Sequence, residues 1–418
     1  MHTSKDAMTH TLETSNSHPP TPALVLDVPK LEGFVARLQD AVDTHWPNAI
    51  LSYSFKTNPL PWLIGFMRDR GLWAEVVSDT EYQLAIALGY SPEHIIYNGP
   101  IKSHQQLWSA LREGSIINLD AKREVSWTAE FATRMPDASL AVGLRVNWDL
   151  EAYCPGQSTN GLEHSRFGFN AENGELDAAI QELNAAGVRI AGLHMHRNSA
   201  TQSVDVYRAA ATVAAEIINS RGLTLDYLDI GGGFYGSMDG APTFHDYIAA
   251  IRKGVENTLD ISNTTLILEP GGSLVAVPVE MHASVIDVKS VCSTTFIVTD
   301  ASRTNIDPLF RRKKPFEYCL ETTAQTTRPE QVISGFTCME DDRLMTLHDQ
   351  PALSVGDRVV FYKVGGYTMS FQPTLFIEPP PPVYARTADR LIQVRHGLEL
   401  TEYLRGNVWS QNSSSVML

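Results

Sequence analysis

The sequence predicts an α/β protein that consists of a (β/α)8 barrel of the TIM type and a C-terminal antiparallel β-domain. Eight short apolar segments alternate with helical patterns over roughly 220 residues, which is the rhythm of parallel strands joined by crossover helices. Polar and reactive residues follow these segments directly, and barrel enzymes keep their active sites at those strand ends. Beyond Pro270 the long helical patterns stop and period-two alternation begins, which predicts antiparallel strands.

The predicted barrel strands are apolar segments, and the predicted helices lie between most of them. The strands are expected at 50–55, 72–77, 94–97, 115–119, 140–146, 189–195, 225–230 and 265–268. Helical patterns fall at 80–88, 104–112, 176–186, 204–220 and 244–258. The residues that follow the strands are Lys56, Ser78, Asn98, Asp120, Asn147, His196, Gly231 and Glu269. We expect these side chains to meet at one mouth of the barrel.

The flanking segments complete the predicted domain organisation. A short strand at 21–28 and an amphipathic helix at 30–45 precede the barrel, and the strand could return to join the β-domain. Strands of the β-domain are expected at 277–289, 294–299, 331–334 and 358–362. The predicted boundaries are a disordered tail at 1–20, the strand and helix at 21–45, the barrel at 46–276, the β-domain at 277–405 and a tail at 406–418.

Composition excludes several classes of function. The formal net charge of the 418 residues is −15, which argues against a nucleic-acid-binding surface. No run of about 18 apolar residues is present to span a membrane, and the polar first 17 residues lack the apolar centre of a secretion signal. The four cysteines form no CxxC pair, which predicts no zinc or redox motif and a reducing compartment, the cytoplasm.

Lys56 is the most unusual residue of the barrel segment. It ends an apolar strand, and Pro59 and Pro61 prevent further pairing after it. Lysine is rarely buried without a partner. One interpretation is an amine of lowered pKa that forms a Schiff base with a carbonyl cofactor. The other is a lysine that extends its stem along the strand end and keeps its charge in water.

Two glycine-containing strand ends indicate an anion site. Gly231, Gly232 and Gly233 follow the seventh strand, and glycines let backbone N–H groups approach a phosphate closely. The segment formally matches the dinucleotide motif GxGxxG, but it lies late in the chain and has no acidic residue at the expected distance. A plain tight turn is the other alternative. After the eighth strand, the carboxylate of Glu269 could keep a pyridine nitrogen protonated, and Pro270, Gly271 and Gly272 follow it.

Two further clusters are candidates for chemistry. His194 and His196 alternate on one strand and share a face, so they could bind a metal or stack on a flat cofactor, but no third ligand of matching spacing is evident, and no metal site is predicted. A strand histidine is also often a core residue. Cys338, followed by three carboxylates up to Asp342, could be a proton donor or a buried thiol beside an acidic turn. Tyr367, after two glycines, offers a hydroxyl.

In this order and spacing, these stretches resemble the fold-type III pyridoxal-phosphate decarboxylases, the family of diaminopimelate, ornithine and arginine decarboxylases. The resemblance covers roughly residues 21–386 and implies the alanine racemase and ornithine decarboxylase fold, pyridoxal 5′-phosphate as cofactor and a head-to-tail homodimer with shared active sites. Lys56 is similar to the Schiff-base lysine. The other barrel residues that the resemblance assigns to the cofactor are Glu75, Glu81, His196, Ser199, Gly231, Gly232, Gly233, Glu269, Gly271 and Gly272.

In the β-domain, the resemblance implies that Cys338 is the thiol contributed by a second subunit. Tyr367 is similar to the tyrosine near the phosphate, and Asp342 keeps a later acidic position of the family. Cys338, Asp342 and Tyr367 are therefore expected to contact the substrate. With Lys56 and Glu269, Cys338 would act in catalysis.

Three departures from the family pattern concern the substrate side. Gly272 stands where the family usually has arginine, Met339 where it commonly has Glu or Asp, and Arg197-Asn198 where it has Val/Ile-Gly. A lost carboxylate beside the thiol argues against a substrate with a plain distal ammonium group. The basic turn 311–314 could receive an anionic substrate or be a solvated surface turn.

The expected activity is decarboxylation of an amino acid or an amino-acid conjugate, in siderophore or other secondary metabolism. Glu269 would keep the ring protonated as an electron sink, and Cys338 or Lys56 would return a proton to Cα. An amino-acid racemase of the same fold is the first alternative, although such enzymes typically place an arginine at the pyridine nitrogen. A non-catalytic regulator that retains the fold is the second.

Overall fold

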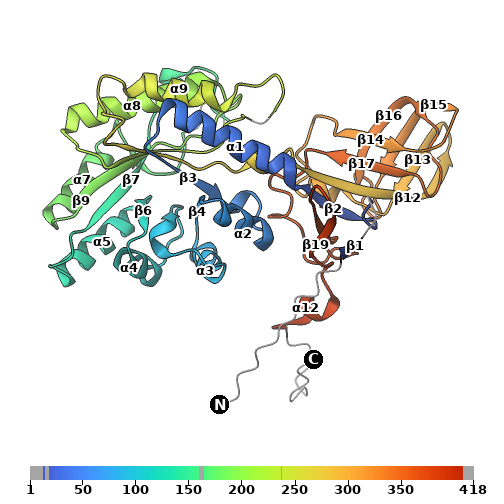
Figure 1. Ribbon diagram of the computed structural model, residues 1–418, viewed down its shortest axis with the longest axis horizontal. Helices are drawn as coiled ribbons and strands as arrows, with labels where there is room; N and C mark the ends of the chain where they lie inside the picture. The colour runs from blue at the N-terminus through green and yellow to red at the C-terminus, as the bar shows by residue number, and fades with distance from the viewer. Residues whose placement is uncertain (1–12, 15–17, 160–163, 237, 408–418) are drawn as a thin grey trace, which may run out of the picture. The chain divides into compact units, whose positions relative to one another are not determined.

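The computed structural model describes residues 13–14, 18–159, 164–236 and 238–407 (Figure 1). The chain forms two compact units, Gly33–Leu274 and Met1–Glu32 with Val275–Leu418. Of the predicted tails at 1–20 and 406–418, only 13–14, 18–20 and 406–407 are among the described residues, so the prediction of disorder falls mostly outside them. Among the helices that the structure describes, none has the length and apolarity needed to cross a lipid bilayer.

The unit Gly33–Leu274 is a closed barrel of eight parallel strands, as the sequence predicts. Hydrogen bonds join the strands in the order β6-β5-β4-β3-β11-β10-β9-β7, and β7 pairs with β6 to close the barrel. The strands are β3 (Ala49–Ser54), β4 (Trp73–Val76), β5 (Ile95–Tyr97), β6 (Ile116–Leu119), β7 (Ala141–Asn147), β9 (Arg189–His194), β10 (Tyr227–Gly231) and β11 (Thr265–Leu268). The two-residue strand β8 (Phe169–Asn170) pairs in parallel with the end of β7.

Helices follow most strands, and side chains cap the start of several of them. Ser78 caps α3, and Thr243 forms a capping box with Asp246 at the start of α9. The helices of this unit are α1 (Val28–His45, which starts in the other unit), α2 (Pro61–Asp69), α3 (Asp79–Ala87), α4 (His104–Glu113), α5 (Lys122–Arg134), α6 (Leu150–Tyr153), α7 (Glu175–Ala185), α8 (Val204–Arg221), α9 (Phe244–Val255) and α10 (Gly272–Val275), with 3-10 turns η1 (Phe55–Thr57) and η2 (Pro92–His94). The sequence patterns did not predict α2 and α5.

The second unit is a mostly antiparallel sheet of ten strands. Its main path is β1-β19-β18-β2-β12-β13-β15-β16, and β17 pairs with both β12 and β14. The strands are β1 (Glu13–Thr14), β2 (Ala23–Asp27), β12 (Val279–Val291), β13 (Thr294–Thr299), β14 (Glu317–Glu321), β15 (Thr327–Ser334), β16 (Arg343–Pro351), β17 (Arg358–Tyr362), β18 (Val383–Arg386) and β19 (Leu391–Arg395). Two short helices, α11 (Arg303–Ile306) and α12 (Leu400–Leu404), lie between and after them.

Two pairings differ from an all-antiparallel sheet. Strand β18 runs parallel to β2, and β15 runs parallel to β13. Strand β2 lies between β18 and β12, so the first long strand of the chain is an interior strand of this sheet. Both faces of β2 contribute to the core, since Ala23, Leu24, Val25 and Leu26 are all buried.

Candidate active site

Lys56 lies on the turn that ends the first barrel strand and contacts a buried carboxylate. Strand β3 ends at Ser54, and Lys56 lies on the turn η1 that follows it. The side chain of Lys56 is 39% exposed, whereas that of Glu75 on β4 is 1% exposed. Lys56 Nζ donates to Glu75 Oε2 at 2.7 Å, and Ser54 Oγ donates to the same oxygen at 2.6 Å. Burial alone would raise the pKa of Glu75, but the charge of Lys56 and these hydrogen bonds outweigh burial and lower it.

A chain of hydrogen bonds leads from Glu75 to Glu269. Asn98, at the end of β5, donates through Nδ2 to Glu75 Oε1 at 3.1 Å and also to Glu269 Oε1. Glu269 follows β11 and is buried. Burial, together with the neighbouring Asp229 and Glu75, raises the pKa of Glu269 well above its usual range. The sequence prediction that Lys56 and Glu269 share one pocket therefore agrees with the geometry.

The glycine loop after β10 packs directly against these residues. Glu269 N donates to the carbonyl oxygen of Gly231 at 2.9 Å. Gly231 has a φ of +73°, and a Cβ there would lie 2.6 Å from the Cβ of His196. A Cβ on Gly232 would lie 2.0 Å from the carbonyl oxygen of Glu269. Only glycine fits these two positions, so the loop backbone approaches the site without intervening side chains.

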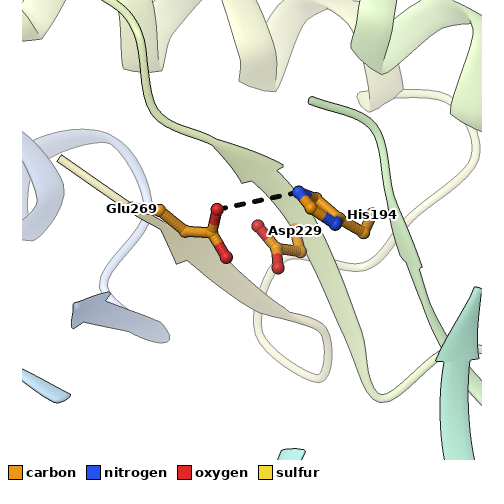
Figure 2. Close-up of side chains that lie close together, drawn as sticks. All are labelled: His194, Asp229 and Glu269. Atoms are coloured by element: carbon orange, nitrogen blue, oxygen red, sulfur yellow. Dashed lines mark ion pairs between the residues drawn. The ribbon is translucent and has the colours of Figure 1, made fainter. Parts of the chain in front are cut away.

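Two histidines of β9 and its end face the same space (Figure 2 shows His194 with Glu269). The ring centroids of His194 and His196 are 6.2 Å apart and their planes differ by 22°. Burial, with the charge of Arg145, lowers the pKa of His194 well below its usual value and that of His196 to about 3. Both imidazoles are therefore neutral at physiological pH, and both offer a flat face on which an aromatic ring could stack.

Figure 2 shows His194, Asp229 and Glu269 converging inside the barrel. One potential ligand atom from each lies within 4.8 Å of the others, and His194 Nε2 is 3.6 Å from Glu269 Oε2. Such a set suits a cation, either a metal ion or a protonated ring nitrogen. Lys56 and the glycine loop lie beside it, which favours an organic cofactor that has an aldehyde, a ring nitrogen and a phosphate.

The residues present fit the predicted pyridoxal phosphate. In the described part of the chain, His194 Nδ1 and Nε2 and His196 Nδ1 are buried polar atoms without a hydrogen-bond partner. A buried polar atom of this kind is costly unless a ligand or water satisfies it. The glycine loop provides the backbone cradle for a phosphate, and Glu269 provides an acid for the ring nitrogen.

The remaining predicted cofactor residues lie in the same unit. Ser199 is buried, and its Oγ accepts from Gln202 N at 3.1 Å. A Cβ on Gly271 would lie 2.1 Å from Thr57 Oγ1, so the end of β11 packs closely on η1. At Gly272, where the family pattern has arginine, a Cβ would meet no atom within 4 Å. Glu81 accepts from Val77 N at 2.9 Å, and burial raises its pKa to about 7.

The predicted substrate contacts Cys338, Asp342 and Tyr367 lie in the unit that contains the β-sheet. Cys338 is exposed, and Tyr367 is half exposed with a φ of +62°. Asp342 is buried and accepts four hydrogen bonds, from Ser302 Oγ (3.0 Å), Arg303 N (2.8 Å), Thr337 N (3.1 Å) and Thr337 Oγ1 (2.6 Å). Its carboxylate thus joins the Cys338 loop to the start of α11, and its contact with substrate stays a prediction.

Several residues of the site were not predicted as members of it. Asn118 on β6 donates to Asp229 Oδ2 at 2.8 Å and to Asn98 Oδ1 at 2.9 Å. Arg145 on β7 pairs with Asp120 at 2.9 Å. Asn98 and Asp120 were recognisable as residues after strands. Asn118, Arg145 and Asp229 lie within strands, where the only signal was a polar residue in an apolar segment.

Comparison with known proteins agrees with this geometry. Residues 32–276 match the family model of the pyridoxal-dependent decarboxylases, pyridoxal binding domain. The probable chloroplastic diaminopimelate decarboxylase of Oryza sativa subsp. japonica is 28% identical over 369 residues, which are 85% of this chain and 74% of that protein. An L-glutamyl-[BtrI acyl-carrier protein] decarboxylase of Niallia circulans is 26% identical over 349 residues, 79% of this chain and 81% of that protein.

A solved structure extends the comparison to the fold. The diaminopimelate decarboxylase of Helicobacter pylori complexed with L-lysine has a TM-score of 0.78 at 22% identity and covers 93% of this chain and 97% of its own. The family match confirms the predicted cofactor, pyridoxal phosphate, and the predicted class of enzyme, a carboxy-lyase that acts on amino acids. This chain belongs to the family of pyridoxal-dependent decarboxylases.

Proposed function

We propose that this protein removes the α-carboxyl group of an amino acid or an amino-acid conjugate, with Lys56, Glu75, His196, the glycine loop and Glu269 as its cofactor site. The observation that carries the proposal is the buried carboxyl of Glu269, joined to the Lys56–Glu75 pair through Asn98. An acid in this position favours a protonated ring nitrogen, which decarboxylation requires.

The residues of this chain divide the work of the reaction. Bound pyridoxal phosphate supplies the electron sink that takes up the electron pair left at Cα when CO2 leaves. Glu75 orients the Lys56 amine, which would attach the cofactor and could later return a proton to Cα. Glu269 would hold a proton at the ring nitrogen, and the neutral ring of His196 would support the cofactor. The N–H groups of Gly232 and Gly233 would bind the phosphate, because the N–H of Gly231 donates to Asp229.

The alternative of a racemase has less support from the site. A racemase of this fold typically has an arginine at the ring nitrogen, where a weaker electron sink limits loss of CO2. Here the residue is Glu269, and its neighbours Asp229 and Asn98 are an acid and an amide. A non-catalytic regulator is also disfavoured, because Lys56, Glu269 and Cys338 are all retained.

The test of this proposal is a pair of measurements on the protein loaded with pyridoxal phosphate. Lys56→Ala should abolish the visible absorbance of the lysine-bound cofactor and the release of CO2, while Lys30→Ala, an exposed lysine of α1, should leave both unchanged. Persistence of the absorbance band in Lys56→Ala would show that another amine binds the cofactor. Racemisation of an amino acid without CO2 release would support the alternative.

The β-domain suggests a substrate that has no free distal ammonium group. Met339 replaces the acid that the family commonly has beside the thiol. In the basic turn 311–314 the side chains are exposed, and Asp307 anchors the turn by accepting from Arg311 N at 3.0 Å and Arg312 N at 3.1 Å. The relative that decarboxylates a glutamyl group on a carrier protein shows that this family also acts on conjugates.

A substrate screen separates these classes. We expect CO2 release from amino acids with an anionic or acylated side chain, or from their conjugates, to exceed that from diaminopimelate, ornithine and arginine by at least about tenfold. In the chain, the matched test is Met339→Glu, which should shift the preference towards diamino substrates. Preference of the unaltered protein for diaminopimelate would contradict this part of the proposal.

We also propose that two copies of the chain form the active enzyme, with Cys338 and Tyr367 of one copy completing the site of the other. The exposure of Cys338 and Tyr367 supports this, because both side chains are accessible to a second copy. Mixing Lys56→Ala with Cys338→Ala protein should restore up to about a quarter of the activity if sites are shared, and none if they are not.

The compartment that we propose is the cytoplasm. The four cysteines are all free, which agrees with a reducing environment.

A further inference from the structure

Beneath Glu269 lies a buried polar layer that the proposed reaction does not yet use. Asn118 Nδ2 donates to Asp229 Oδ2 at 2.8 Å and to Asn98 Oδ1 at 2.9 Å. Asn98 Nδ2 donates to Glu269 Oε1, and the ring closes between Glu269 and Asp229, whose carboxyl groups have oxygen atoms within 4.8 Å of each other. All four residues are at most 4% exposed, so solvent does not supply alternative partners.

Two buried carboxyl groups this close to each other disfavour double ionisation, so the pair holds a proton. The donors around the pair decide where this proton lies. Asp229 accepts from Asn118 Nδ2 and, through Oδ1, from Gly231 N at 2.8 Å. Glu269 accepts from Asn98 alone among the described donors. Because Asp229 has more donors, it is the better anion, and Glu269 carries the proton.

The charged surroundings keep the pair at one proton. The titratable groups that face it from the packed elements are Lys56 on η1, Glu75 on β4, His194 on β9 and Tyr227 on β10. Lys56 is paired with Glu75, and His194 is neutral, so neither cancels a second negative charge on the pair. Burial raises the pKa of Asp229 to about 7, and it raises the pKa of Glu269 well above its usual range.

We propose that Asp229 is a positioning residue that keeps Glu269 protonated until the cofactor ring nitrogen arrives, so that ring binding displaces this proton. The proton leaves the Glu269 oxygen for the ring nitrogen, or for water when the ring is already protonated. No other bond changes, and Glu269 becomes the anion that pairs with the ring cation. This inference rests on the proposed role of Glu269, and it adds how many protons the site releases when the ring binds.

The same reasoning predicts what Asp229→Asn does. The asparagine amide can donate to Glu269, which can then stay ionised in the empty site. The variant has no shared proton to displace. Whatever the state of the free ring, the unaltered protein should therefore release about one more proton per site than the variant when the ring binds.

The experiment measures protons exchanged when cofactor-free protein binds pyridoxine 5′-phosphate at pH 6 to 8, by calorimetry in buffers of different ionisation enthalpy. This probe has the ring nitrogen and the phosphate but no aldehyde, so the chemistry of Lys56 does not enter. Glu124→Gln is the matched control. Glu124 is a buried acid of the same unit, paired with Lys102 rather than with Glu269, and its replacement should keep the proton count of the unaltered protein.

The outcomes are distinct. A difference of about one proton between the unaltered protein and Asp229→Asn, with none for Glu124→Gln, supports the inference. Equal proton counts with weakened binding would give Asp229 a purely structural role and overturn it, while leaving the decarboxylase assignment intact. If Asp229→Asn does not fold, the pH dependence of the count in the unaltered protein decides, because the count must fall as the pH rises through the raised pKa of Glu269, which holds the last proton of the pair. A constant count would overturn the inference.

Discussion

Two buried carboxylates, one in each unit, have opposite surroundings. Asp342 in the sheet unit is 3% exposed and accepts four hydrogen bonds, from two hydroxyls and two backbone N–H groups. Glu269 in the barrel is 4% exposed, accepts from Asn98 and faces two further acids. Burial is the same, so the difference lies in the donors. A carboxylate with enough donors joins structural elements, whereas one that lacks them is ready to bind a cation.

The largest expected effect is the loss of activity in Glu269→Gln. A neutral amide cannot hold a proton at the ring nitrogen by charge pairing, so turnover should fall on the order of 10²-fold. The free energy of unfolding of the cofactor-free protein should stay equal or rise, because two buried acids no longer oppose each other. CO2 release and denaturant unfolding measure the two quantities. Glu93→Gln, which changes an exposed acid of η2, is the control. Unchanged turnover in Glu269→Gln would show that Glu269, like Asp342, has only a structural role.

The next effect concerns stability in the other unit. Asp342→Ala leaves four donors without their acceptor, so the free energy of unfolding should fall by about 3 kcal/mol. Urea denaturation measures the change, and Asp341→Ala, an exposed neighbour, should have little effect. If Asp342→Ala lowered turnover but not stability, Asp342 would belong with Glu269 as a functional acid, as the sequence resemblance implies.

The smallest effect comes from Glu81, which has one donor, Val77 N, but is only partly buried. Its pKa of about 7 in the folded chain lies above the usual value of 4.5, so the folded state binds the proton more tightly. Its contribution to stability is therefore full below pH 4.5 and is lost as the pH rises to about 7. In Glu81→Gln, the loss of unfolding free energy between pH 4.5 and pH 8 should be smaller by about 1 kcal/mol, which denaturant unfolding at these pH values measures. An unchanged slope would place the titration on another group.

The fold could be predicted well where the apolar pattern was uninterrupted. Each barrel strand lies within a few residues of its predicted position, because a strand buried on both faces is a continuous apolar run. Helix α5 could not be predicted in this way. Its buried face includes Glu124 and Thr128, and Glu124 is stabilised by Lys102 Nζ at 3.1 Å, so the apolar periodicity is broken. Helix α2 begins at Pro61, a residue that the sequence pattern indicated only as one that prevents strand pairing.

The site could be predicted in part. Lys56, His196, Gly231 and Glu269 occur at strand ends, where barrel topology brings distant residues together. The ring formed by Asn98, Asn118, Asp229 and Glu269 depends on which residues of four strands lie at the same height inside the closed barrel. Strand register is set by the packing of the whole barrel, so no local pattern could indicate these contacts.

The interior position of β2 has a consequence for synthesis on the ribosome. The barrel unit is one continuous stretch, Gly33–Leu274, and it can collapse as soon as that stretch has emerged. Strand β2 is made earlier but has to wait for β12 and then for β18, some 350 residues later, before both of its edges are paired. During translation, the nascent chain therefore carries an apolar strand with open edges ahead of a folded barrel, which is a natural binding site for a chaperone.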